Sequence, residues 1–358
     1  MNAQFTQHNL IFKQASGTSR GVLTTKETYL LEISKNGQKG IGECAIFRGL
    51  SYDDVPDYEE KLTWLCENIN LDFEVLKKEL LHYPSIIFGL EQALLNLQHG
   101  EDLYFPSDFT DGKDSIKING LIWMGNADFM QSQIEEKLAK GFDCIKLKIG
   151  VDWKSEKEII KKLREKFPKE QLELRVDANG AFSYEEASMV LQELADLGIH
   201  SIEQPIKKSE VRSPKSEENS EKKSTDCCIP WNKMARLCAE TPTPIALDEE
   251  LIGIIDFEEK KKLLETIKPQ YIILKPALVG GFSGSDEWIA IAESLGINWW
   301  ITSALESNIG LNAICQYTYT KKNPLPQGLG TGALFTNNFE THLQLEGDQM
   351  WHKKTPYY

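Results

Sequence analysis

The sequence predicts an α/β protein in which a (β/α) barrel follows a smaller α+β domain. The first observation is a series of aliphatic, strand-like runs that each end in a charged residue, namely Lys148, Asp177, Glu203, Asp248 and Lys275. The second is their spacing of 29, 26, 45 and 27 residues, since a strand–helix–strand unit takes roughly 30 residues. The third is position, because the end of a barrel strand lies at the mouth, where catalytic groups occur.

The first hundred residues show strands followed by helices. The runs 29–33 and 39–44 predict neighbouring antiparallel strands joined by the turn signal at 35–37. Helical patterns follow at 58–67 and 86–99. We therefore predict an α+β domain over residues 1–112, with the break in the polar segment 107–114. We also expect the C-terminal tail, 336–358, to pack back on this domain.

Residues 113–335 are predicted to form the barrel. The predicted strands are 117–123, 144–149, 174–177, 201–205, 245–250, 271–275 and 298–303. The predicted helices between them are 128–140, 155–167, 183–197, 232–240, 256–267 and 285–295. Ser183 and Glu186 have capping-box spacing, and Gly198 ends that helix. The alternation implies a parallel sheet, and the number of units favours a barrel over a short open sheet.

The interval of 45 residues has a visible cause in the polar segment 207–228. This segment is rich in Ser, Glu and Lys and has almost no apolar residues, so it cannot offset the entropy lost on ordering. We predict an exposed, mobile insertion, whose removal restores the period. The vicinal Cys227 and Cys228 lie inside it, and nothing else in the sequence supports a redox role for them.

Composition narrows the class of protein. A chain of 358 residues with 41% hydrophobic content is long enough for about two domains. We expect a cytoplasmic protein without a membrane partner, because no apolar run is long enough to span a bilayer and residues 1–20 lack a signal-peptide centre. Seven cysteines without zinc-site spacing indicate reduced thiols. The net charge of −14 without a basic cluster argues against nucleic acid as a partner. The sequence leaves the oligomeric state open.

The charged strand ends predict a metal-assisted acid–base site. Residues two apart in a strand point to the same side, so Lys146 accompanies Lys148, and Arg175 accompanies Asp177. Carboxylates from three strands suit Mg²⁺, and the lack of His and Cys argues against zinc. We expect a lysine beside the cation to have a lowered pKa, as a general base requires. A single charged residue of this kind is more often a solvated strand end, but five in period are difficult to explain that way.

The glycine-rich segments 280–281 and 328–332 allow two interpretations. Their backbone amides could bind phosphate, but the dinucleotide-binding fingerprint is absent. Turns or close backbone approach are the favoured interpretation.

The motifs in their order resemble the enolase superfamily, in the branch of muconate-cycloisomerising enzymes, dipeptide epimerases and o-succinylbenzoate synthases. They are Lys-x-Lys at 146–148, Asp-Ala-Asn-Gly at 177–180, Glu-Gln-Pro at 203–205, Asp-Glu at 248–249 and Leu-Lys-Pro at 274–276. The resemblance covers essentially the whole chain and implies a (β/α)₇β TIM-type barrel with an N-terminal α+β capping domain. The insertion departs from the usual connection after the fourth strand.

Within the superfamily, several segments resemble the o-succinylbenzoate synthases. These segments are 47–51, 84–91, 118–125, 303–307 and 328–335. This resemblance implies a hydro-lyase of menaquinone biosynthesis. Such an enzyme dehydrates 2-succinyl-6-hydroxy-2,4-cyclohexadiene-1-carboxylate, a small carboxylate, to o-succinylbenzoate by syn elimination through an enediolate.

The resemblance also implies roles for residues. Asp177, Glu203 and Asp248 would bind Mg²⁺, for which Mn²⁺ could substitute. Lys148 would be the base and Lys275 the cation that stabilises the enediolate.

Further residues are assigned supporting roles. Lys146 and Arg175 would assist with the substrate carboxylate or position the base. Asn179, Ser303 and Arg48 are further candidates for substrate binding. Segments 16–20 and 47–51 are candidate lid loops, with ordinary surface turns as the alternative.

Two other functions stay open at this point. An N-acylamino acid racemase or dipeptide epimerase of the same superfamily would use two opposed lysines, although segment 328–332 lacks the acidic pair usual in a dipeptide epimerase. A non-catalytic metal- or metabolite-binding scaffold acting through the insertion is the second alternative, and it gives the lysines no purpose.

Overall fold

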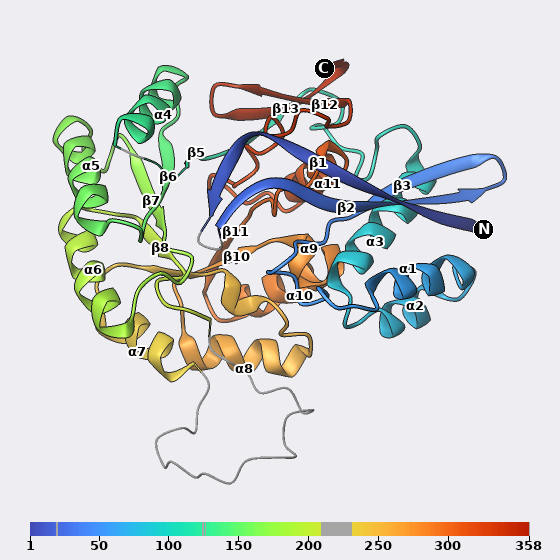
Figure 1. Ribbon diagram of the computed structural model, residues 1–358, viewed down its shortest axis with the longest axis horizontal. Helices are drawn as coiled ribbons and strands as arrows, with labels where there is room; N and C mark the ends of the chain where they lie inside the picture. Colours follow the sequence, from blue (N-terminus) through green and yellow to red (C-terminus); the bar gives the residue numbers. More distant parts are fainter. Residues whose placement is uncertain (19–20, 124, 126, 209–230, 358) are drawn as a thin grey trace, which may run out of the picture.

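A curled sheet of parallel strands, together with the helices that connect them, makes up the larger part of the molecule (Figure 1). The computed structural model describes residues 1–18, 21–123, 125, 127–208 and 231–357. Most of the predicted insertion at 207–228 lies outside the described residues, and so do Cys227, Cys228 and Arg20 of the first candidate lid loop.

Within the described residues, seven strands form the curled sheet, and they follow one another in chain order from one edge to the other. They are β5 (Gly120–Ile122), β6 (Cys144–Lys148), β7 (Glu173–Asp177), β8 (Ser201–Glu203), β9 (Ile245–Leu247), β10 (Tyr271–Leu274) and β11 (Asn298–Ile301). Each neighbouring pair is parallel, as the alternation of strands and helices predicted. All seven predicted strands are therefore confirmed in type.

Helices connect these strands, and Figure 1 shows α4 to α8 arranged around the outside of the sheet. They are α4 (Ala127–Ala139), α5 (Trp153–Lys166), α6 (Tyr184–Asp196), α7 (Asn232–Glu240), α8 (Phe257–Ile267), α10 (Gly281–Ser294) and α11 (Asn308–Thr320). The predicted capping box of α6 is present, with Glu186 N donating to Ser183 Oγ and Ser183 N donating to Glu186 Oε2. Sequence patterns missed α11, because it is buried on nearly every side and has no polar stripe.

Residues 327 and 328 lie between the two edge strands of the curled sheet. Gly328 N donates to Ile301 O (2.8 Å) beside β11, and Gln327 N donates to Lys117 O (2.9 Å) before β5. Gly328 is required for this approach, since a Cβ there would lie 2.0 Å from Thr302 Oγ1. At this glycine, close backbone approach is the interpretation that the structure supports.

The N-terminal region has an antiparallel sheet of β1 (Asn2–Thr18), β2 (Gly21–Lys35) and β3 (Gln38–Cys44). The predicted turn between β2 and β3 is confirmed, and both Asn36 and Gly37 have positive φ, as a two-residue hairpin turn requires. The sequence analysis missed β1, because few of its side chains are buried: Leu10 and Phe12 belong to a separate small core.

Three helices pack beside this sheet, namely α1 (Tyr58–Glu67), α2 (Phe73–Glu79) and α3 (Pro84–His99). The helix α3 lies very close to β3, because a Cβ at Gly42 would fall 2.0 Å from Gly89 O. A core of its own joins the helices to β2 and β3, and it includes Leu31, Leu62 and Leu90.

The C-terminal strands β12 (Thr341–Glu346) and β13 (Gln349–Tyr357) form a hairpin that pairs with β4 (Ser115–Lys117). The preceding residues contact β1, where Ile11 N donates to Asn337 Oδ1 (2.8 Å). The tail 336–358 therefore contacts both the N-terminal sheet and the segment that leads into β5. The division into domains 1–112 and 113–335 stays a prediction.

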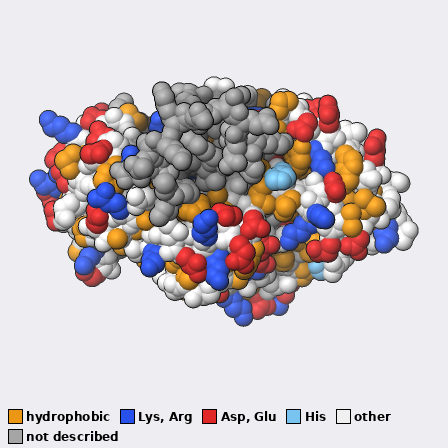
Figure 2. Space-filling view, turned by 90° about the horizontal axis from the view of Figure 1, so that it is seen from below, with side chains coloured by type: hydrophobic (Ala, Val, Ile, Leu, Met, Phe, Trp, Pro, Cys, Tyr) orange, Lys and Arg blue, Asp and Glu red, His pale blue; other side chains and the backbone are white. Residues whose placement is uncertain are grey.

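The outer helices carry charges of both signs. Arg236 pairs with Glu240 on α7, and Lys261 pairs with Glu265 on α8. Figure 2 shows acidic and basic side chains interspersed on the face that is seen from below in Figure 1. In the part of the chain that the structure describes, no helix combines the length and apolar character that a bilayer crossing needs.

Candidate active site

The charged residues predicted at the strand ends meet at one edge of the curled sheet. Lys148 ends β6, Asp177 ends β7 and Glu203 ends β8, while Asp248 and Lys275 directly follow β9 and β10. The register pairs Lys148 with Asp177 and Asp177 with Glu203. Because parallel strands place their carboxyl ends together, residues up to 127 positions apart in the chain become neighbours.

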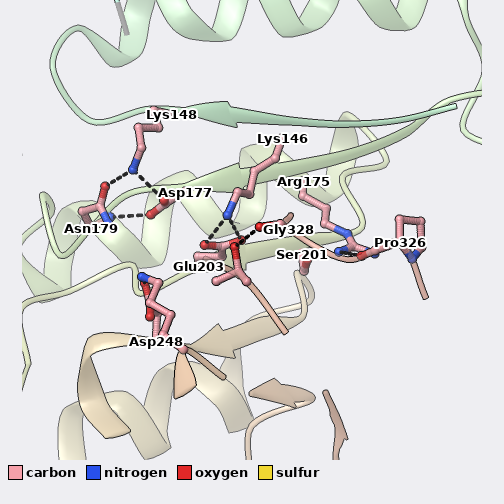
Figure 3. Close-up of polar contacts among 12 residues, drawn as sticks. Lys146, Lys148, Arg175, Asp177, Asn179, Ser201, Glu203, Asp248, Pro326 and Gly328 are labelled. Carbon is pink, nitrogen blue, oxygen red and sulfur yellow. Dashed lines mark hydrogen bonds and ion pairs between the residues drawn. The ribbon is translucent and has the colours of Figure 1, made fainter. Parts of the chain in front are cut away.

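Each of the three carboxylates pairs with a lysine, and Figure 3 shows the pairs of Lys148 with Asp177 and of Lys146 with Glu203. Lys148 Nζ lies 2.8 Å from Asp177 Oδ2, and Lys146 Nζ lies 2.8 Å from Glu203 Oε1. Lys275 Nζ donates to Asp248 Oδ2 at 2.5 Å. All three carboxylate residues are 3% exposed or less. We name these six residues the mouth cluster.

Burial and mutual repulsion shape the charges of the mouth cluster. Burial, opposed by Lys146 and reinforced by Asp177 and Asp248, raises the pKa of Glu203 to about 7. Burial also acts to raise the pKa of Asp177, but Lys148 and Lys146 outweigh it and lower that pKa to about 2. The lysines thus compensate Glu203 less than they compensate Asp177.

Beside carboxylates alone, two of the lysines have raised pKa values, and the lowering expected beside a bound cation stays a prediction. Burial acts to lower the pKa of Lys275, but Asp248 and neighbouring carboxylates outweigh it and raise that pKa. The pKa of Lys146 is raised in the same way, chiefly by Glu203. The prediction assumed a cation beside the lysines, whereas in this structure the nearest charges are carboxylates.

A pocket opens at the mouth cluster. Its wall combines lysines and carboxylates with aliphatic and aromatic side chains and with hydroxyl groups. The lining residues are Phe47, Leu50, Asn119, Leu121, Trp123, Lys146, Lys148, Asp177, Asn179, Glu249, Lys275, Thr302, Ser303, Ala304, Leu305, Gly328, Gly330 and Thr331. This mixture suits a small molecule with both an apolar body and anionic groups.

Asn179 and Gln204 hold the mouth residues from the loops behind them. Asn179 accepts a hydrogen bond from Lys148 Nζ (2.6 Å) and donates to Glu249 Oε1 (3.0 Å). Gln204 Oε1 accepts from Asp248 N (3.3 Å). Both residues have positive φ, 44° and 38°, a strained conformation that surrounding contacts must hold. Both belong to motifs that the sequence analysis singled out, but it gave Gln204 no role.

The structure does not bring every predicted site residue to the pocket. Arg175 is fully buried behind Asp177, where it donates to Pro326 O (2.9 Å) and Glu173 Oε1 (2.7 Å) and its Cζ lies 4.2 Å from the Trp300 ring centre. In Figure 3 it points away from Lys148.

Arg48 also lies outside the pocket wall. Its guanidinium pairs with Glu27 and Asp54. Its neighbours Phe47 and Leu50 do line the pocket. Ser303, by contrast, lies in the wall, where its hydroxyl donates to Glu306 Oε2 at 2.6 Å.

Sequence reasoning gave no role to four polar residues of the pocket wall, namely Asn119, Glu249, Thr302 and Thr331. Asn119 lies between β4 and β5. Its Oδ1 is buried without a hydrogen bond among the described residues. A buried acceptor of this kind is costly unless a ligand or water satisfies it. Its only sequence signal was its place in the strand predicted at 117–123.

The donor chemistry of the mouth fits Mg²⁺, since Asp177, Glu203 and Asp248 offer oxygen alone. Glu203 Oε1 accepts no hydrogen bond among the described residues, although Lys146 Nζ is near it. Each of the three carboxylates is paired with a different lysine. The ligand atoms that do lie within 4.8 Å of one another, in the described part of the chain, belong to Asp102, His342 and His352.

Fold and site together define a class: an α/β protein with a TIM-barrel-like sheet that carries paired lysines and carboxylates at its carboxyl edge. Comparison with known proteins gives the family. The chain belongs to the enolase C-terminal domain-like family, whose model matches residues 130–216 and 226–351. The predicted membership of the enolase superfamily is therefore confirmed.

Three relatives illustrate the similarity. The o-succinylbenzoate synthase of Desulfotalea psychrophila is 41% identical over 380 residues, which cover 97% of this chain and 98% of that protein. The crystal structure of MenC from Desulfotalea psychrophila superposes with a TM-score of 0.83 at 39% identity, covering 98% and 99% of the two chains. The N-succinylamino acid racemase of Thermus thermophilus is 33% identical over 312 residues, or 82% of this chain and 75% of that protein.

Proposed function

We propose that this chain is an o-succinylbenzoate synthase, a hydro-lyase of menaquinone biosynthesis. Its substrate would be 2-succinyl-6-hydroxy-2,4-cyclohexadiene-1-carboxylate, dehydrated to o-succinylbenzoate. The observation that carries the proposal is the placement of Lys148 and Lys275 in one pocket with Asp177, beside the buried carboxylates of Glu203 and Asp248. The similarity to a synthase over nearly the full length of both chains supports this activity over others of the superfamily.

We further propose that the curled sheet is a (β/α)₇β barrel, closed by residues 327 and 328 as an eighth strand. The hydrogen bonds from these residues to both edges support closure. The strands β6 and β10 are four positions apart in the sheet order. In an eight-membered ring that separation is diametric, so Lys148 and Lys275 would lie on opposite faces of a bound substrate. Residues 1–112 would act as the capping domain.

Asp177, Glu203 and Asp248 are the residues that would hold Mg²⁺ in this proposal. When bound, the ion supplies positive charge that neutralises the charge developing on the substrate carboxylate. The lysines would then exchange their carboxylate partners for substrate, since ion pairs within the mouth and substrate binding use the same groups.

The protein's own residues would perform the proton transfers. Lys148 Nζ, held by Asn179 Oδ1, would take the proton α to the ring carboxylate. Protonated Lys148 would then give that proton to the departing hydroxyl on the same face, which accounts for syn elimination. Lys275 would keep its ammonium form and stabilise the enediolate, whose negative charge replaces that of Asp248 as its partner.

The pocket wall would orient the substrate. Lys146, close to Glu203, would contribute positive charge beneath the substrate carboxylate. Leu50, Trp123 and Leu305 would cover the apolar ring. Asn119 offers a hydrogen bond to a polar substituent, since its unsatisfied Oδ1 needs a donor.

The test is turnover of the cyclohexadiene substrate by purified protein with Mg²⁺, followed by ultraviolet absorbance. We expect rapid aromatisation that EDTA abolishes and that Lys148→Ala lowers by roughly 10²- to 10⁴-fold, the usual contribution of a general base. Circular dichroism of the variant serves as the folding control. Absence of turnover in the folded wild-type protein with Mg²⁺ would refute the proposal.

Racemisation of N-acylamino acids is the second candidate, because two lysines that face one substrate can each exchange a proton with it. The similarity to the Thermus thermophilus N-succinylamino acid racemase favours this candidate over dipeptide epimerisation. Deuterium incorporation from D₂O into N-succinylamino acids, measured by mass spectrometry, tests it. Exchange without dehydration of the cyclohexadiene would make racemisation the main activity.

A further inference from the structure

A second group of ligand-type side chains lies away from the mouth cluster. Asp102 follows α3, His342 lies in β12 and His352 lies in β13. One ligand atom from each residue lies within 4.8 Å of the other two. We name these three residues the hairpin cluster, because the C-terminal hairpin supplies two of them.

Asp102 is the centre of the hairpin cluster. Its Oδ2 lies 2.5 Å from His342 Nδ1 and 3.4 Å from His352 Nε2. Two amides of α11 fix the residue from behind, with Gln316 Nε2 (2.8 Å) and Asn312 Nδ2 (2.9 Å) both donating to Asp102 O. Such fixation of a ligand by outer partners is typical of metal sites.

His352 supplies an independent observation. Its side chain is 5% exposed, and neither ring nitrogen makes a hydrogen bond among the described residues. The ring packs at 5.8 Å from Phe109 and 5.2 Å from His342, centre to centre. His352 Nε2 faces the shared carboxylate at 3.4 Å without the geometry of a hydrogen bond, and Nδ1 makes none among the described residues, which leaves Nε2 open to a further group.

The charges beside Asp102 differ from those at the mouth. Within the described chain its carboxylate pairs with two imidazoles and with no lysine or arginine, in contrast to every carboxylate of the mouth cluster.

We propose that Asp102, His342 and His352 bind a divalent transition-metal ion of the zinc class. Two imidazoles and one carboxylate are a donor set that such ions favour over Mg²⁺. Tetrahedral bonds of about 2.0–2.1 Å place ligand atoms roughly 3.3 Å apart. The separation of Asp102 Oδ2 and His352 Nε2, 3.4 Å, already matches this spacing, and that of Asp102 Oδ2 and His342 Nδ1, 2.5 Å, would have to lengthen.

The position of the hairpin cluster indicates how an ion could reach it and which elements the ion would join. The side chains of His342 and Asp102 are 25% and 31% exposed, so the ion has an entry path and room for water as a fourth ligand. The ion would join the C-terminal hairpin to the segment after α3, beside α11. We therefore expect it to stabilise the attachment of this hairpin, apart from the chemistry at the mouth.

Isothermal titration calorimetry with Zn²⁺ tests the proposal on the full-length, chelator-treated protein in millimolar Mg²⁺. We expect one Zn²⁺ per wild-type chain and a rise in Tm on binding. His342→Gln and Asp102→Asn, which keep the shape of the side chains, should each weaken binding at least about tenfold. His82→Gln, at an exposed histidine remote from the hairpin, is the matched control and should bind as the wild type does.

An independent variant separates the two sites. Asp248→Asn alters the mouth and should leave Zn²⁺ affinity unchanged within about threefold, whatever it does to turnover. Zinc binding that Asp248→Asn removes and His342→Gln preserves would overturn the proposal, and so would wild-type protein without stoichiometric Zn²⁺. Because the readout is metal binding, failure here leaves the proposed synthase activity to its own assay.

Discussion

The mouth cluster and the hairpin cluster differ in the groups that accompany their carboxylates. At the mouth, three carboxylates meet three lysines, and each carboxylate has an ammonium partner. At the hairpin, two imidazoles share the single carboxylate of Asp102, and His352 lacks a hydrogen bond within the described chain. The comparison shows that the side chains beside a carboxylate determine which ligands its site can bind. A hard cation and an anionic substrate suit the first set, and a borderline metal suits the second.

The largest effect should follow from changing one carboxylate of the mouth. Asp248→Asn removes a candidate Mg²⁺ ligand and leaves Lys275 without its partner. We expect turnover to fall by roughly 10³-fold or more, since metal stabilisation of developing charge is worth several kcal/mol. Steady-state kinetics over a range of Mg²⁺ concentrations measures this. Turnover within tenfold of wild type would remove Asp248 from the metal site.

A single and a double substitution should measure how much the buried pair of Lys146 and Glu203 contributes to stability. Lys146→Met leaves Glu203 buried without its cation and should lower the free energy of unfolding by about 3–5 kcal/mol. The double variant Lys146→Met/Glu203→Gln should recover most of this loss, because both charges are then gone. Urea denaturation with EDTA present, so that no metal replaces the lysine, measures both values. An additive double variant would mean that the pair is not coupled.

Glu91 is a buried carboxylate outside both clusters, and its partners are backbone N–H groups. Glu91 Oε2 accepts from Phe282 N (2.5 Å) at the start of α10. Burial, opposed by those hydrogen bonds, raises the pKa of Glu91 to about 7. The folded state thus binds more protons than the unfolded state between pH about 4.5 and 7, so this residue makes stability fall as pH rises through that window.

Glu91→Gln should therefore flatten the pH dependence of unfolding. The contribution removed is at most about 3 kcal/mol between pH 5 and 8. Urea denaturation at pH 5, 6, 7 and 8 measures it, with Glu165→Gln, an exposed residue of α5, as the control. Parallel pH profiles for wild type and Glu91→Gln would show that Glu91 titrates normally.

The sequence predicted the mouth far better than the hairpin, for a physical reason. Parallel strands repeat at a nearly constant interval. The spacing of Lys148, Asp177, Glu203 and Lys275 therefore predicts that they lie at the same edge of the sheet. Asp102 lies 240 residues before His342 and belongs to no repeat. Nothing local in a sequence indicates which distant loop a C-terminal hairpin will contact.

Similar limits explain the other misses. Strand β1 buries few side chains, and α11 buries nearly all, so neither has the polar–apolar period that sequence analysis detects. Arg175 has the right period and is in register with Lys146, but its guanidinium is buried against Trp300 and does not line the pocket. Periodicity gives the face of a strand that a residue occupies, and depth along that face depends on the three-dimensional packing.

The smallest effect should come from an exposed ion pair near the pocket. Arg48, whose side chain is 42% exposed, pairs with Asp54 at 2.9 Å and also with Glu27. Exposed pairs contribute little to stability, about 0–1 kcal/mol. However, these pairs hold the loop that carries Phe47 and Leu50 into the pocket wall.

Arg48→Ala should therefore raise KM several-fold, with kcat within about twofold and stability changed by less than about 1 kcal/mol. Lys39→Ala is the matched control, because Lys39 also makes an exposed pair, with Glu32 at 2.9 Å, but does not line the pocket. Saturation kinetics and urea denaturation of both variants separate positioning from stability. If KM and kcat both stay unchanged in Arg48→Ala, the loop 47–51 is an ordinary surface turn, and charge compensation matters for function only inside the mouth.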